Sequence, residues 1–124
     1  MKIRMHTQSI RLRLSQHDVS NLKENSSVSV PLFVGMHEDD LYIYKLSLID
    51  EGKSEVKLQQ DQLHILILKS ELHNWLMHDD VVSFECTLET ISAPLLLLIE
   101  RDFKCVTPRK ENEEDLFENP NTKC

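Results

Sequence analysis

Glycine is almost missing from this sequence, which contains two among its 124 residues. A glycine-rich loop that holds a nucleotide phosphate needs several glycines, so this class of site is excluded. Long apolar runs are missing as well: the most apolar stretch, residues 94–99, is six residues long, whereas a membrane-spanning helix needs about 20. The first seven residues contain no apolar run, so we expect neither a secretory signal nor a membrane partner.

Cysteine is scarce and scattered. Cys86, Cys105 and Cys124 lie far apart and form no Cys-x-x-Cys pair, and no His-x-x-x-His occurs. Metal sites need closely spaced ligands of these types, so the sequence predicts no metal ion and no other cofactor. Without a secretory signal, we expect the three thiols to be free in the reducing cytoplasm.

Positive charge is in deficit, because 14 basic residues face 21 acidic ones and the formal net charge is −7. This balance disfavours nucleic acid or anionic lipid as a partner over the whole surface. The distribution is uneven, however. Every acidic residue lies at position 18 or later, whereas four of the basic residues precede that position.

Apolar residues alternate with polar ones through most of the first half, a pattern typical of strands with one buried face. Residues 2–14 are predicted to form a hairpin. Ser15 and Asp18 have the spacing of a capping box, which predicts a helix over residues 16–24. Strands should follow at 27–34 and 41–48, and Pro31 suggests that the first of them lies at a sheet edge.

The second half repeats this order of elements. A hairpin is predicted over residues 55–59 and 62–68, followed by a helix that Ser70 caps. Two strands, 81–88 and 94–100, complete the half. The helix carries one apolar face, formed by Leu72, Trp75 and Leu76.

A shift of 53 positions aligns the two halves, so that Val19 falls on Leu72 and Val28 on Val81. Chance explains the strand matches easily, but it explains less well why the helix falls at the same place in both halves. We therefore expect an α+β, mainly β fold: one pseudo-twofold β-barrel built from two ββαββ repeats, at about 2–48 and 55–101. This single domain should span residues 1–106, and 107–124 should form a flexible acidic tail.

Two resemblances follow from these patterns. The hairpin from Lys2 to Leu14, with the helix and strand after it, resembles the swapped-hairpin β-barrel domain of AbrB- and MazE-type proteins, and residues 55–101 do so more loosely. That resemblance implies a homodimeric DNA-binding regulator or antitoxin. The whole chain is also similar to a small uncharacterised bacterial family, whose members begin with an Ile-Arg-Leu-Arg-Leu hairpin and end in a segment like Glu100–Cys105 with an acidic tail.

One candidate site emerges from the uneven charge. If the apolar residues of the first hairpin face inward, its outer face carries four cations, Lys2, Arg4, Arg11 and Arg13. Three interpretations stay open: a site for phosphate or nucleic acid, an ordinary strand face paired with acids of neighbouring strands, or a docking site for the acidic tail. In the last case Leu116 and Phe117 are candidate anchors.

No catalytic residue is identified. The similar motifs at residues 36–40 and 77–80 combine histidine with acids, but both fall at predicted turns, where acids are common. We therefore expect a small non-catalytic binding or regulatory module, with an unknown protein or small ligand as its partner. A nucleic-acid-binding or antitoxin-type protein is the alternative, and a small enzyme with a site at the seam between the repeats is a second one. The protein should be a monomer or a weak homodimer.

Overall fold

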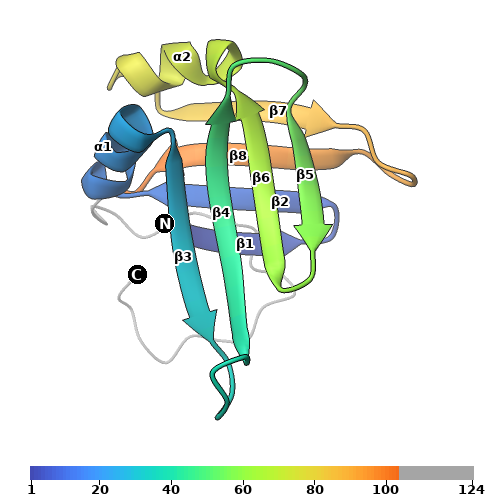
Figure 1. Ribbon diagram of the computed structural model, residues 1–124. Helices are drawn as coiled ribbons and strands as arrows, with labels where there is room; N and C mark the ends of the chain where they lie inside the picture. The colour runs from blue at the N-terminus through green and yellow to red at the C-terminus, as the bar shows by residue number, and fades with distance from the viewer. Residues whose placement is uncertain (104–124) are drawn as a thin grey trace, which may run out of the picture.

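The computed structural model describes residues 1–103 of the chain, which contain eight strands and two helices (Figure 1). The elements agree with the predicted ones to within two residues at each end. In chain order they are β1 (Lys2–His6), β2 (Ser9–Leu14), α1 (Gln16–Asn25), β3 (Ser27–Phe33), β4 (Leu41–Ile49), β5 (Glu55–Gln59), β6 (Gln62–Leu68), α2 (Lys69–Met77), β7 (Ser83–Leu88) and β8 (Leu95–Arg101).

The strands form two four-stranded sheets. We call the sheet with the order β1-β2-β8-β7 sheet A, and the one with the order β3-β4-β6-β5 sheet B. The strands of sheet A run across those of sheet B, with the two helices at one corner (Figure 1). The α+β, mainly β class is confirmed, but the described residues do not form the predicted closed barrel. Strands that cross steeply cannot share a hydrogen-bonded ladder, so the sheets pack face to face instead.

Each sheet combines one hairpin from either half of the chain. Parallel pairing joins β2 to β8 in sheet A and β4 to β6 in sheet B. Ile10 lies opposite Leu97, and Leu63, 53 positions after Ile10, lies opposite Tyr44, 53 positions before Leu97. The antiparallel ladders β1–β2 and β5–β6 are related by the same offset.

The strand β7 departs from this offset. Val28 pairs with Leu46 in β3–β4, and Phe84 pairs with Ile99 in β7–β8. The residue in the position of Val28 is therefore Phe84, and the predicted match with Val81 is wrong. The physical reason is the longer connection between α2 and β7, which places Val81 before the strand.

The predicted capping box at the start of α1 is confirmed. The Ser15 side chain accepts a hydrogen bond from the Asp18 backbone N–H (3.2 Å), and the Asp18 carboxylate accepts one from the Ser15 N–H (2.9 Å). The helix ends at Asn25, and the C-cap residue after it, Ser26, adopts a left-handed conformation with φ 60°. Val19 and Leu22 point into the core.

The predicted cap of the second helix is wrong. Ser70 lies inside α2, and Leu68, the last residue of β6, precedes the helix without a side-chain capping bond. The strand β6 continues directly into α2, and Ser54, which belongs to neither element, forms hydrogen bonds with both. The Leu68 N–H donates to the Ser54 hydroxyl (2.9 Å), which in turn donates to the Glu71 carboxylate in the first turn of α2 (3.1 Å).

The core lies between the two sheets and under both helices. Pro31 is at an edge, as predicted, because β3 is the outermost strand of sheet B. The largest fully buried side chains are Trp75, Leu12, Leu14, Leu22, Leu46, Ile65, Ile67, Leu72, Leu97 and Ile99. No helix in residues 1–103 is both long enough and apolar enough to cross a membrane.

Trp75 is the largest of these residues and links α2 to the segment before β7 and to the end of β8. Its indole N–H donates to the Val82 carbonyl (3.2 Å), and the Arg101 guanidinium lies 4.4 Å from the centre of its ring. The same guanidinium donates to the carbonyls of Trp75 and Val81. A buried indole with a satisfied N–H and a cation over its face contributes both apolar burial and a fixed orientation.

A buried ion pair lies at the start of α1. The N-terminal ammonium group of Met1 lies 2.7 Å from the Asp18 carboxylate, and the Tyr44 hydroxyl donates to the Met1 carbonyl (2.8 Å). Burial alone would raise the pKa of Asp18, but hydrogen bonds from the ammonium group and from Ser15 outweigh it and hold that pKa below its ordinary value.

Replacing Trp75 by alanine should lower the free energy of unfolding by about 3–5 kcal/mol, because the side chain is fully buried. Met77→Ala, at the exposed end of the same helix, is the matched control and should cost less than about 1 kcal/mol. Urea unfolding followed by circular dichroism measures both. A loss below about 1 kcal/mol for Trp75→Ala would contradict the packing described above.

Replacing Asp18 by asparagine should lower the free energy of unfolding at pH 7 by about 1–2 kcal/mol, because it removes the negative charge that pairs with the Met1 ammonium group and accepts from the Ser15 N–H. The folded state holds the pKa of Asp18 below its unfolded value. The stabilisation is therefore complete above the unfolded pKa and is lost as the pH falls through the folded one. Urea unfolding from pH 7 to 2 should show wild type and variant converging at the acid end. Asp39→Asn, at an exposed turn, is the matched control and should have the same free energy of unfolding as the wild type.

Candidate functional site

The four predicted cations share the outer face of sheet A. Ile10, Leu12 and Leu14 turn toward the core, so alternation along the hairpin directs the residues between them outward. In the β1–β2 ladder Lys2 lies opposite Arg13, and Arg4 lies opposite Arg11. The structure thus brings together all four residues that the sequence singled out.

Acidic residues neutralise one end of this face. Glu100, which lies opposite Arg13 in the β2–β8 ladder, is 2.9 Å from the Arg13 guanidinium and 3.4 Å from that of Arg11. Asp102, just beyond β8, is 2.8 Å from the Lys2 ammonium group. A hydrogen bond from Lys2 lowers the pKa of Asp102. Of the three interpretations of the basic face, the ordinary strand face paired with acids therefore fits this end.

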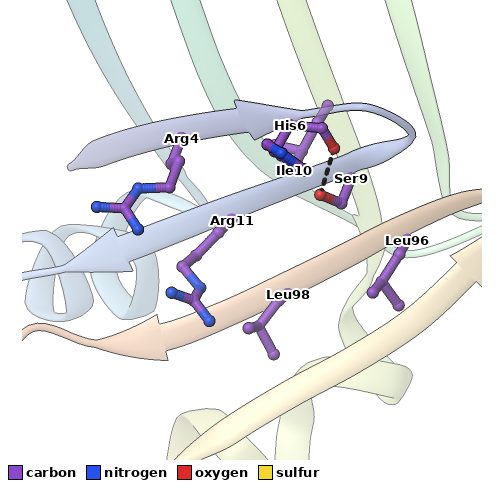
Figure 2. A pocket seen from close by; sticks show the side chains of 7 residues that line it. All are labelled: Arg4, His6, Ser9, Ile10, Arg11, Leu96 and Leu98. Atoms are coloured by element: carbon purple, nitrogen blue, oxygen red, sulfur yellow. Dashed lines mark hydrogen bonds between the residues drawn. The ribbon is translucent and has the colours of Figure 1, made fainter. Parts of the chain in front are cut away.

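The other end of the face is open. Arg4 makes no ion pair with any residue of 1–103. A hollow of about 290 Å³ lies between Arg4 and Arg11 and reaches the apolar side chains of Leu96 and Leu98 on β8 (Figure 2). The two arginines extend from neighbouring strands on the same side of the sheet. Two guanidinium groups beside an apolar floor suit a phosphate or carboxylate attached to an apolar group.

The turn of the first hairpin forms the remaining wall of the hollow. His6 and Ser9 line it, and the Ser9 hydroxyl donates to the His6 carbonyl (2.7 Å). Neither residue was among those predicted from the sequence, and the two leucines were not predicted either. Period-two alternation places His6 and Ser9 on the same face as the arginines, so this signal was available. The leucines belong to a strand from the other half of the chain, and only the β2–β8 pairing reveals them.

Sheet B carries no comparable face. The residues 53 positions after the four cations are Glu55, Lys57, His64 and Leu66. His64 approaches the Ser47 hydroxyl (2.9 Å). Burial, together with the nearby Lys45 and Lys57, lowers the pKa of His64, so its neutral form is favoured. Within residues 1–103, sheet B therefore lacks the hairpin face of four cations that sheet A carries, although Lys45 and Lys57 flank His64.

The other predicted candidates fall where the sequence analysis placed them or outside the described residues. The two motifs of histidine and acids lie at turns, and no group of potential metal ligands occurs within residues 1–103. Cys86 is half-buried opposite Leu97, and burial raises the pKa of its thiol, which does not favour a nucleophile. The remaining two cysteines and the candidate anchors Leu116 and Phe117 lie outside the described residues.

Comparison with known proteins identifies the family of the chain but no activity. A family model described as a family of unknown function, DUF7009, matches residues 1–121. The chain belongs to this family. No curated protein and no solved structure matches it. The expected membership of an uncharacterised family is confirmed, and what this DUF7009 protein binds has to be inferred from the geometry of sheet A.

Proposed function

We propose that this DUF7009 protein is a small binding module that holds an anionic group of its partner on the outer face of sheet A. The observation that carries the proposal is the pair Arg4 and Arg11. Their side chains border one hollow, and the only carboxylate that approaches either of them within residues 1–103 is Glu100, at 3.4 Å from Arg11. Lys2 and Arg13 add to the local potential, although acids already contact both.

The chemistry of the hollow favours binding over catalysis. Guanidinium groups bind phosphate or carboxylate through two parallel hydrogen bonds and do not exchange protons near neutral pH. Leu96 and Leu98 offer apolar contact beside the anion. The hollow lies at the seam between the halves, because β2 and β8 meet there, but the residues of 1–103 that line it include no carboxylate that could act as a general acid or base beside the arginines. Binding is therefore the function that its lining supports best.

A nucleic-acid-binding protein of the AbrB or MazE kind is the second candidate. The observation in its favour is that Arg4 and Arg11 stand side by side, as phosphate contacts do. Two observations weigh against it. The net charge is −7, and the second half carries Glu55 and Leu66 at the positions equivalent to Lys2 and Arg13, whereas a pseudo-symmetric DNA reader uses both copies. We keep it as an outcome of the first experiment below. A cytoplasmic location and a bacterial source stay predictions from the sequence.

We also propose that the two halves arose by duplication of a ββαββ unit. The ladders β1–β2 and β2–β8 correspond to β5–β6 and β4–β6 at one constant offset along the chain. The hairpin turns correspond as well, because Thr7 and Gln60 both have φ 49°. A left-handed residue at equivalent places in two turns is uncommon outside glycine, so this agreement supports more than a shared strand pattern.

Anion binding is tested by fluorescence anisotropy with three labelled probes: duplex DNA, single-stranded DNA and a glutamate-rich peptide. We expect at least one probe to bind the wild type, and to bind more weakly at about 200 mM than at about 50 mM salt. Replacing both Arg4 and Arg11 by glutamate should weaken that binding by at least about tenfold, since two charge-assisted contacts are lost. The matched control, Lys57→Glu on sheet B, should bind like the wild type.

The three probes distinguish the proposed function from the nucleic-acid alternative. Binding of DNA but not of the peptide would make the nucleic-acid alternative the leading one. Binding of no probe at the lower salt concentration, or equal binding by wild type and the double variant, would overturn the proposed function.

Glu100→Gln should strengthen the binding of the same probe several-fold, because it releases Arg11 and Arg13 from their shared carboxylate. Glu85→Gln is the matched control. It removes the same charge from the same face, but Glu85 lies opposite Leu98 and contacts neither arginine. If both variants gained affinity equally, net charge and not the local release of the guanidinium groups would explain the effect.

A further inference from the structure

The strand β1 has a free edge. It pairs with β2 on one side, and no strand of residues 1–103 pairs with its other side. Four of its five residues are exposed. The N–H and C=O groups along such an edge can accept a further strand, and natural proteins usually protect long edges against this.

Leu32 and Tyr42 of sheet B form an apolar surface, which we call the apolar shelf, where such a strand would lie. The Tyr44 hydroxyl binds the Met1 carbonyl, so Tyr44 of sheet B lies under the beginning of β1. Its hairpin continues past β1 (Figure 1). Tyr42 lies two residues from Tyr44 on β4, and Leu32 lies opposite Tyr42 on β3. Two residues of a strand span about 6.6 Å, which exceeds the spacing of about 4.8 Å between neighbouring strands, so a strand added to β1 would reach both side chains. Leu32 lies on the inner side of β3, which faces the core, yet it is 50% exposed.

The side chains of β1 define the partner strand. Lys2 and Arg4 point outward, and directly opposite side chains in a ladder are about 4.5–5.5 Å apart, so opposite charges there are favoured. Ile3 and Met5 point inward, and Met5 is 53% exposed. A strand added to β1 should therefore carry acids on its outer side and apolar residues on its inner side, where they would cover Leu32.

The other sheet edges within residues 1–103 lack this combination. The edge strand β3 contains Pro31, which cannot donate to a ladder. On β5, Glu55 and Lys57 pair with each other at 3.4 Å. The outward residues of β7 include Glu85 and no cation. A second copy of the chain is also a poor occupant for β1, because antiparallel pairing of two such strands would place cations against cations.

We propose that the edge of β1 binds an extended acidic peptide of a partner protein by strand addition, with acidic residues alternating with apolar ones. This inference rests on the proposed function, because it names the partner of the same positive face. It adds two requirements that simple anion binding lacks. The peptide must donate and accept backbone hydrogen bonds along one of its edges, and Leu32 must contribute to its affinity.

The test compares three labelled ten-residue peptides that alternate glutamate with valine, titrated against the full chain by fluorescence anisotropy. One peptide is unmodified, one is N-methylated at the glutamates and one at the valines. A strand offers the N–H groups of alternate residues to each of its two edges. We therefore expect one methylated peptide to bind at least about tenfold more weakly and the other to bind like the unmodified one.

A pair of protein variants tests the shelf. Leu32→Ser should weaken binding of the unmodified peptide several-fold, because the inner apolar side chains lose their contact. Ile91→Ser, which changes a fully exposed apolar residue in the β7–β8 connection, is the matched control and should bind normally. Both replaced side chains are at least half exposed, so we expect both variants to fold. Thermal unfolding checks that they are folded at the temperature of the titration.

The outcomes separate the two proposals. Equal binding of all three peptides, sensitive to Arg4→Glu, would overturn strand addition and leave the anion-binding function standing. Equal loss for both methylated peptides, or normal binding by Leu32→Ser, would also overturn the strand geometry. If the alternating peptide fails to bind while a DNA or glutamate-rich probe binds, the inference is wrong and the proposed function holds. If no anionic probe binds, both are wrong.

Discussion

Parallel pairing of β2 with β8 and of β4 with β6 is the interaction on which the rest of this structure depends. Each half of the chain supplies two hairpins, and a two-stranded hairpin is at best marginally stable in water. The parallel pairs join hairpins from different halves into four-stranded sheets, each with a buried face. Leu12 beside Ile99 and Leu46 beside Ile65 lie in these central pairs, and all four are fully buried. The two helices then close the corner at which the sheets meet.

The same pairing controls the charge of the outer face of sheet A. It places Glu100 against Arg13 and within reach of Arg11, and it leads the chain on to Asp102 beside Lys2. It also places Leu96 and Leu98 next to the open end of the basic face. One half of this face is therefore neutral and structural, whereas the other half, around Arg4, is free to take an anion. This division explains how an acidic protein can present one positive site without a positive surface.

The edge strands of the two sheets are protected in different ways against pairing with a further strand. Pro31 interrupts the donor row of β3, and an internal ion pair occupies the outer side of β5. On β1, charged side chains are the only protection that residues 1–103 supply. Lys2 and Arg4 repel a second copy of the same edge, but they attract an acidic strand. An edge guarded only by charge is selective and not closed, and this property connects the positive face with the apolar shelf beyond it.

The sequence by itself determined the local elements of this protein. Alternation revealed all eight strands and the outward direction of the four cations, and the spacing of Ser15 and Asp18 revealed the first helix, because these signals depend on neighbours a few positions apart. Only the tertiary structure decided how the hairpins combine. It replaced the expected barrel with two crossed sheets, shifted the counterpart of Val28 to Phe84, and brought Glu100 to the arginines. Such contacts join strands from different halves of the chain, and no local pattern encodes which strand becomes the neighbour of another.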